Sequence, residues 1–118
     1  MAALALGGCA TATPEPPVAT HPIKLDAAQL KAIERSVANG LKDPESARFN
    51  MITGVAGADG RVRACGYVNA KNSFGGYVGM RPFAGAFDGS NNFVFVLAEG
   101  VPQSADILGI CKSRGILI

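Results

Sequence analysis

Four strand-like runs follow one another in residues 48–97, separated by short turns. Apolar residues alternate in the first two runs, residues 48–55 and 61–69, as is typical of strands with one buried face. The turn between them contains Asp59 and Gly60, and an Asp-Gly pair favours a tight hairpin. Consecutive runs joined in this way predict an antiparallel meander of four strands.

The third and fourth runs differ in their pattern. Residues 77–87 contain Gly79, Pro82 and Gly85, which predict a strand at the edge of the sheet or one with a bulge. Residues 93–97, Phe-Val-Phe-Val-Leu, are apolar on both faces. This pattern predicts a strand in the interior of the sheet.

One helix is expected before the four runs in the chain, and another after them. Asp26 is a good N-cap for the first helix, and Gln29 follows it at the spacing of a capping box. The apolar side of this helix consists of Leu30, Ile33, Val37 and Leu41. We expect this side to pack on the sheet rather than to bind a partner. A second, short helix is predicted over residues 103–113, with Ser104 as its cap, so the fold class is α+β.

The N-terminus contains the tetrapeptide Leu6-Gly7-Gly8-Cys9, which resembles the lipobox of bacterial lipoproteins. The resemblance implies that residues 1–8 are a signal peptide remnant that is removed, and that Cys9 is then acylated. Two or three acyl chains, palmitate among them, would anchor the chain firmly in a membrane.

Two further details concern this anchor. No lysine or arginine precedes the short apolar run, so we expect translation to start upstream of Met1. Ala10 follows the cysteine where enterobacterial lipoproteins retained in the inner membrane have Asp. The resemblance therefore implies a place in the cell envelope, on the outer membrane and facing the periplasm.

Residues 9–24 are rich in proline and read as an extended tether, followed by a single domain over residues 25–118. His21 is the only histidine and is interpreted as a solvated tether residue. No apolar run is long enough to predict a membrane-spanning helix.

The chain has three cysteines, which is an odd number for an exported protein. If Cys9 carries lipid, Cys65 and Cys111 remain as an even pair. They form either a disulfide or two buried free thiols, and export favours the disulfide.

The sequence offers few parts for catalysis. A triad would lack a histidine base within the domain, there is no Cys/His cluster for zinc, and the glycines match no nucleotide-binding motif. We therefore predict no enzyme activity, no catalytic residues, no metal and no cofactor. A hydrolase with two facing carboxylates is a further alternative. The net charge of +2 is too small to indicate nucleic acid binding.

The most distinctive polar segment lies between the second and third runs. The candidate binding residues are Asn69, Lys71, Asn72, Ser73, Tyr77 and Arg81. Lys71 and Arg81 make the segment basic, and Phe74 would be costly to expose unless a partner covers it. The segment is either a recognition loop or a structural turn whose polar side chains satisfy backbone groups.

The run C-G-Y-V-N-A-K-N-S-F-G-G-Y over residues 65–77, the R-P-F of residues 81–83, and the turn of residues 42–49 carry a family resemblance. They are similar to small, largely uncharacterised proteobacterial outer-membrane lipoproteins and related phage-borne proteins. The resemblance spans residues 41–83 and implies an exported domain without assigning catalytic residues.

Together these patterns predict a non-enzymatic envelope lipoprotein, held to the membrane by its N-terminal lipid, whose domain binds a protein or an envelope polymer such as peptidoglycan, or has a structural role. The alternative is an inhibitor of a secreted or periplasmic enzyme such as a peptidoglycan hydrolase. The sequence leaves the oligomeric state open.

Overall fold

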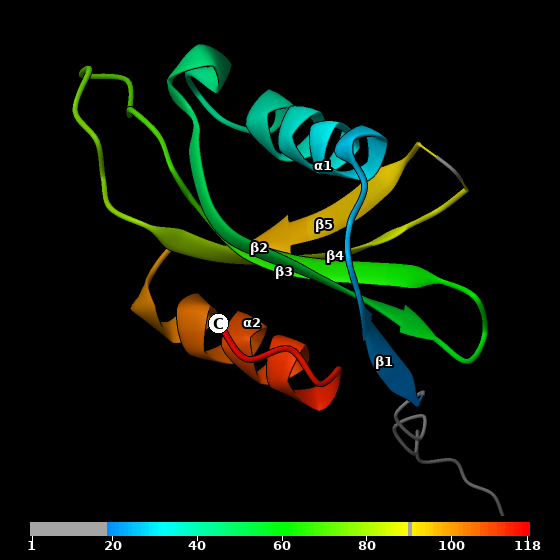
Figure 1. Cartoon of the computed structure of the whole chain (residues 1–118). Coiled ribbons are helices and arrows are strands. Elements are labelled where there is room, and N and C mark those ends of the chain that lie inside the picture. Colours follow the sequence, from blue (N-terminus) through cyan, green and yellow to red (C-terminus); the bar gives the residue numbers. More distant parts are fainter. Residues whose placement is uncertain (1–18, 90) are drawn as a thin grey trace, which may run out of the picture.

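The computed structural model describes residues 19–89 and 91–118. In chain order the elements are β1 (Thr20–Ile23), α1 (Ala27–Asn39), the 3-10 helix η2 (Pro44–Ser46), β2 (Arg48–Gly57), β3 (Val62–Asn69), β4 (Arg81–Phe87), β5 (Phe93–Leu97) and α2 (Val101–Ser113). The strands form one antiparallel sheet in the order β1-β2-β3-β4-β5. Helices α1 and α2 lie on opposite faces of this sheet (Figure 1). The predicted α+β class and antiparallel meander are confirmed.

The sheet has five strands, so the predicted number of four is wrong. The additional strand, β1, lies in the segment that we interpreted as tether, and it includes His21. It pairs with Gly54–Gly57 of β2, and the Thr20 hydroxyl donates to the carbonyl of Arg114 at 2.7 Å. Pro22 made the segment look unsuited to a sheet, but an edge strand tolerates proline because one of its sides has no partner. The predicted lipidation site, Cys9, lies outside the described residues.

Helix α1 begins as the sequence predicts. The Gln29 amide donates to Asp26 Oδ1 at 2.7 Å, and the Asp26 amide donates to Gln29 Oε1 at 2.9 Å. These two bonds form a capping box, which satisfies N–H groups that have no partner within the helix. Ile33 and Val37 are fully buried, so the predicted apolar side packs on the sheet. No helix in residues 19–89 or 91–118 combines the length and the apolar character needed to span a bilayer.

The predicted positions of the last two strands are reversed. β4 lies inside the sheet and β5 is the edge strand. Gly85 does not weaken β4, because its missing side chain leaves room for the ring of Phe93 on β5. β5 is apolar on both faces although only one is buried: Phe93 is buried, whereas Val94 and Val96 are exposed.

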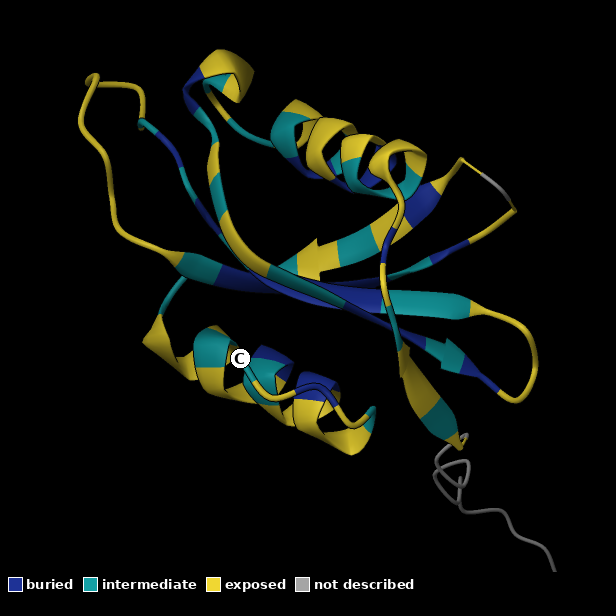
Figure 2. Ribbon diagram, viewed as in Figure 1, coloured by how far each residue is buried: buried dark blue, intermediate teal, exposed yellow. Residues whose placement is uncertain are grey.

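The two faces of the sheet support separate hydrophobic cores, coloured dark blue in Figure 2. The core under α1 consists of Leu25, Ala32, Ile33, Val37, Ala64, Val68, Phe83, Phe87 and Phe93. The core under α2 consists of Val55, Cys65, Ala84, Ala98, Ile107, Cys111 and Ile116. Ala64 and Cys65 are neighbours in β3 yet belong to different cores, because successive side chains of a strand point to opposite faces.

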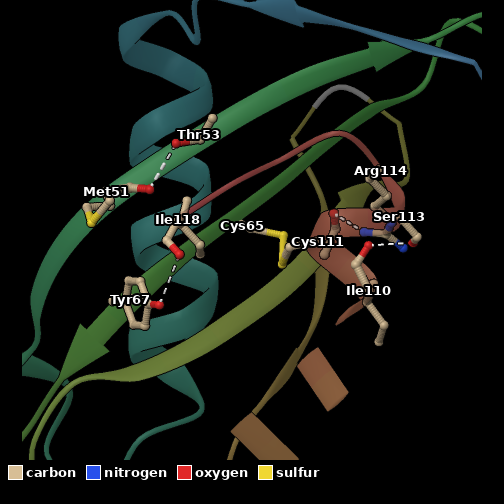
Figure 3. Close-up of a disulfide and its surroundings, with 10 residues drawn as sticks. Met51, Thr53, Cys65, Tyr67, Ile110, Cys111, Ser113, Arg114 and Ile118 are labelled. Carbon is tan, nitrogen blue, oxygen red and sulfur yellow. Dashed lines mark hydrogen bonds between the residues drawn. A yellow bond between two sulfur atoms is a disulfide. The ribbon is translucent and has the colours of Figure 1, made fainter. Parts of the chain in front are cut away.

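A disulfide joins Cys65 of β3 to Cys111 of α2, as predicted (Figure 3). Both cysteines are fully buried, and the bridge closes 46 residues of sequence. The start of α2 differs from the prediction, since the N-cap is Gly100 and Ser104 lies inside the helix. The Ser104 hydroxyl instead donates to the carbonyl of Gly100 at 3.0 Å. Pro102 explains the earlier start, since proline is accommodated in the first turn, where N–H groups have no helical partner.

Candidate functional site

The candidate site is the connection between β3 and β4, residues 70–80, which we name the 70–80 loop. It extends away from the sheet in Figure 1, and Figure 2 shows most of it as exposed. The predicted strand over residues 77–87 begins only at Arg81, so Tyr77 and the three residues after it belong to the loop. A single bridge between Lys71 and Tyr77 holds the two arms of the loop together.

The tip of the loop is closed by Asn72. Its side-chain oxygen accepts hydrogen bonds from the amides of Phe74 at 2.9 Å and Gly76 at 3.2 Å. The Asn72 amide in turn donates to the carbonyl of Gly76, and the Gly75 amide donates to the carbonyl of Asn72. Gly75 has a φ of 83°, which glycine adopts without a steric penalty. These bonds fix the backbone on both sides of Phe74.

The base of the loop is attached to η2 through Ser46, the one polar residue among those described that is buried. The Lys71 amide donates to the Ser46 hydroxyl oxygen at 2.8 Å, and the Tyr77 hydroxyl donates to the Ser46 carbonyl at 3.0 Å. Ser46 is itself oriented by donating to the carbonyl of Asp43 at 2.8 Å. Both arms of the loop are therefore tied to the same residue.

Asn69 and Arg81 lie where the loop joins the sheet. The side-chain oxygen of Asn69 accepts from the Gly79 amide at 2.9 Å, which fixes the returning arm. Arg81 Nη1 donates to the carbonyl of Ala98 at 3.4 Å, while its Nε is buried without a hydrogen-bond partner in the part of the chain that the structure describes. Asn69 and Arg81 thus support the loop from its base.

The surface of the loop is mainly apolar. Phe74 is 96% exposed at the tip, and Tyr77, Val78 and Met80 are also exposed. Lys71 is the only charged residue of the loop, and its Nζ lies 5.7 Å from the centre of the Tyr77 ring, within cation–π range. Ser73 is exposed next to Phe74. The loop therefore presents an apolar surface with one positive charge.

The predicted binding residues fall into two groups. Lys71, Ser73 and Tyr77 lie on the loop surface. The other three hold the loop in place: Asn69 and Asn72 accept from loop amides, and Arg81 donates to the carbonyl of Ala98 at the base of the loop. The asparagines thus have the structural role that we considered. Their bonds use backbone amides and not the ring of Phe74, which stays available to a partner. Within residues 19–89 and 91–118, no three His, Cys, Asp or Glu residues are grouped as metal ligands would be.

Sequence reasoning did not identify Ser46, Val78 or Met80 as part of the site. Nothing local indicates that Ser46 touches a loop 25 residues further along the chain. Val78 and Met80 fall within the strand that the sequence predicts over residues 77–87. Gly79, directly after Val78, is the signal within this segment that it is not regular strand.

Comparison with known proteins gave no match: no protein-family model, no curated protein and no solved structure matches the chain.

Proposed function

We propose that this chain is a non-enzymatic lipoprotein of the bacterial cell envelope whose domain binds a protein partner through the 70–80 loop. The observation that carries the proposal is the exposure of Phe74, which is 96% accessible at the tip of a loop with a fixed backbone. Full burial of a phenylalanine side chain stabilises by about 1.5–3 kcal/mol. A partner that covers Phe74 gains this energy, and the domain alone does not.

The order of the loop favours binding further. Ordering a loop on binding costs about 0.5–1.5 kcal/mol for each immobilised side chain, and a loop that is already ordered avoids part of this cost. Here Asn72 fixes the tip and Ser46 holds both arms. The loop is thus preorganised to enter a cleft or a pocket on a partner.

The arrangement of the sheet supports a membrane-anchored orientation. Thr20 of β1 pairs with Gly57, next to the turn between β2 and β3, whereas Arg48 at the other end of β2 pairs with Asn69, where the loop begins. The chain therefore enters the domain at one end of the sheet and the loop leaves it at the other. With a lipid on Cys9 and a tether after it, the domain would present the loop away from the outer membrane and into the periplasm.

The alternative function, an inhibitor of a secreted or periplasmic enzyme such as a peptidoglycan hydrolase, is favoured by the same protruding loop. Hydrolases that act on glycans place acidic residues in their clefts, and the loop carries Lys71 and no acid. Inhibition of a panel of purified peptidoglycan hydrolases by the domain tests this alternative. Loss of inhibition in Lys71→Ala would show that the loop is the inhibitory element.

The direct test of the proposal is a capture experiment with a matched pair of variants. Phe74→Ser removes the exposed ring, and Val101→Ser removes another highly exposed apolar side chain at the start of α2. We expect the wild type and Val101→Ser to retain the same envelope protein, identified by mass spectrometry, and Phe74→Ser to lose it. Capture that is equal for all three, or capture of peptidoglycan alone, contradicts the proposal.

The anchor is tested separately from the loop. Cys9→Ser is expected to move the protein from the membrane fraction to the soluble fraction, with loss of metabolic labelling by palmitate. Labelling that persists in Cys9→Ser would show that Cys9 is not the site of lipidation.

A further inference from the structure

A second surface lies between β5 and α2, on the face of the sheet opposite to α1. It is a groove of about 470 Å³, which we name the β5–α2 groove. Its lining includes Ala84 of β4, Val94 and Val96 of β5, Ile110 and Arg114 of the α2 end, and Arg61 before β3. The groove forms because α2 packs on β4 and leaves β5 uncovered, so that Val94 and Val96 are 57% and 53% exposed.

The backbone beside the groove is also unoccupied. β5 is the last strand of the sheet, and in the part of the chain that the structure describes no other strand pairs with its outer side. An edge strand presents a row of free N–H and C=O groups, to which an extended peptide can add as a further strand. The side chains of such a peptide would alternate, and every second one would face the groove.

One end of the groove is positively charged. Arg114 Nη1 donates to the carbonyl of Gly85 at 3.1 Å, and Arg61 Nε donates to the carbonyl of Phe87 at 3.1 Å. Both guanidinium groups are thus held on β4, two residues apart, and each keeps further N–H groups for a ligand. Burial and, to a lesser extent, the nearby charges of Arg63 and Arg61 lower the pKa of Arg114.

Among the residues that line the groove, Asp88 is the one acid beside the two arginines. Asp59 is engaged by Arg63, with 2.9 Å between its Oδ2 and the Arg63 Nη2. Asp88 lines the groove and stands against the two cations of Arg61 and Arg114. The end of the groove therefore retains a net positive charge, which complements an anion.

The register of the sheet determines which part of a peptide meets this charge. Gly85 pairs with Phe95 and Phe87 pairs with Phe93, so the two arginines lie toward the N-terminal end of β5. A peptide that continued the antiparallel sheet would run opposite to β5, and its own C-terminus would lie at this end.

From this arrangement we infer that the β5–α2 groove binds the C-terminal segment of another protein. Neighbouring strands lie about 4.8 Å apart, so a strand added outside β5 is about 10 Å from the arginines that are held on β4. The segment therefore adds to β5 as an antiparallel strand only up to its last residues, which turn inward under β5 into the groove. Apolar side chains of the segment cover Val94, Val96 and Ile110, and its terminal carboxylate is bound by Arg61 and Arg114. Carboxylate–guanidinium hydrogen bonds are among the stronger polar contacts in proteins and give geometric specificity. This site is separate from the 70–80 loop, which leaves the opposite end of β3.

The experiment uses the full chain and two fluorescein-labelled pentapeptides of sequence Ser-Val-Thr-Val-Val, one with a free C-terminal carboxylate and one amidated. Fluorescence anisotropy is expected to show binding of the free acid and at least tenfold weaker binding of the amide, because the amide cannot pair with the arginines. Equal affinity for both peptides, or no binding of either, overturns the inference.

Variants test whether the peptide binds in the groove. Arg61→Gln should weaken binding of the free-acid peptide at least fivefold, and Val96→Asp should abolish it. Both side chains are exposed, so these variants are expected to fold. Lys112→Gln removes a charge from α2 at a position away from the groove, and it should leave the affinity for the free acid unchanged. Phe74→Ser should also bind the free acid with the affinity of the wild type. The inference is overturned if Val96→Asp binds the free acid as tightly as the wild type does. It is also overturned if sedimentation shows that the wild-type chain is a dimer and that Val96→Asp is a monomer, because the groove would then be a dimer interface.

Discussion

Gly85 of β4 packs tightly against β5. A Cβ atom at this position would meet the carbonyl oxygen of Val94 and the ring of Phe93. Gly85→Ala is therefore expected to destabilise the domain by about 1–3 kcal/mol, the usual cost of overpacking. The measurement is chemical denaturation followed by circular dichroism.

Gly109 provides the matched control. It lies in α2, and a Cβ atom there would meet nothing within 4 Å apart from its chain neighbours and the nearby backbone of its own helix. Gly109→Ala should stabilise by about 0.5–1 kcal/mol, since alanine loses less backbone entropy in a helix. Two variants with the same effect on the free energy of unfolding would show that the packing at Gly85 is not as described.

Asp59 provides a prediction about pH. Hydrogen bonds from the Arg63 side chain and the Arg61 amide lower the pKa of Asp59 from 3.8 to about 2. A carboxyl group whose pKa is lower in the folded state stabilises above its unfolded pKa, and this contribution disappears as the pH falls through the folded value. Wild type should thus be more stable than Asp59→Asn above pH 4, with the difference vanishing near pH 2.

The comparison is made by measuring the free energy of unfolding of both proteins between pH 2 and pH 6. A difference that is constant over this range would mean that the Asp59–Arg63 pair does not form in solution. Because Asp59 is exposed to solvent, added salt should also reduce the difference.

At the scale of elements, the sequence predicts what depends on neighbouring residues. The capping box of Asp26 and Gln29 acts within one turn, and α1 begins where these residues indicate. β3 and β5 were also recognised, since their alternation or apolar content is local. Positions that depend on distant contacts were missed, including β1, whose pairing with β2 links segments more than 30 residues apart.

The candidate site shows the same division. The segment that contains the loop stands out in sequence through its glycines, its asparagines and Phe74. The Asn72 bonds are local, within four residues, and match the structural turn that the sequence left open. The attachment of both arms to Ser46 depends on contacts between distant parts of the chain, which leave no local pattern. The sequence does not predict the β5–α2 groove, because nothing in it indicates that α2 packs on β4 and leaves β5 uncovered.

The disulfide is the covalent link between α2 and the sheet. On the loop-entropy argument, a bridge that closes 46 residues contributes about 4 kcal/mol. The double variant Cys65→Ala and Cys111→Ala should therefore lose about 2–4 kcal/mol of stability. Amide exchange at Ile107 should increase more than at Ile33, since α1 is held by a separate core.

The control for this prediction is the wild type treated with a reductant. It should resemble the double variant in thermal denaturation. A melting temperature that neither the reductant nor the double variant lowers would contradict the stabilising role of the bridge.

At the scale of the whole molecule, the surfaces are distributed around one sheet. β1 brings the chain in at one end, the 70–80 loop projects from the other, and the β5–α2 groove lies along the free edge. A domain tethered at its N-terminus could therefore engage a partner through the loop without obstruction by the membrane. The groove would remain free for a second segment.

Photo-cross-linking in the native envelope shows whether the 70–80 loop contacts a protein partner. A photoreactive phenylalanine derivative, which keeps the aromatic ring, replaces Phe74 in one protein and Glu34, exposed on α1, in another. The proposed function predicts one recurrent protein adduct from position 74 that is absent from position 34. No discrete adduct at position 74, or the same adducts from both positions, would contradict it.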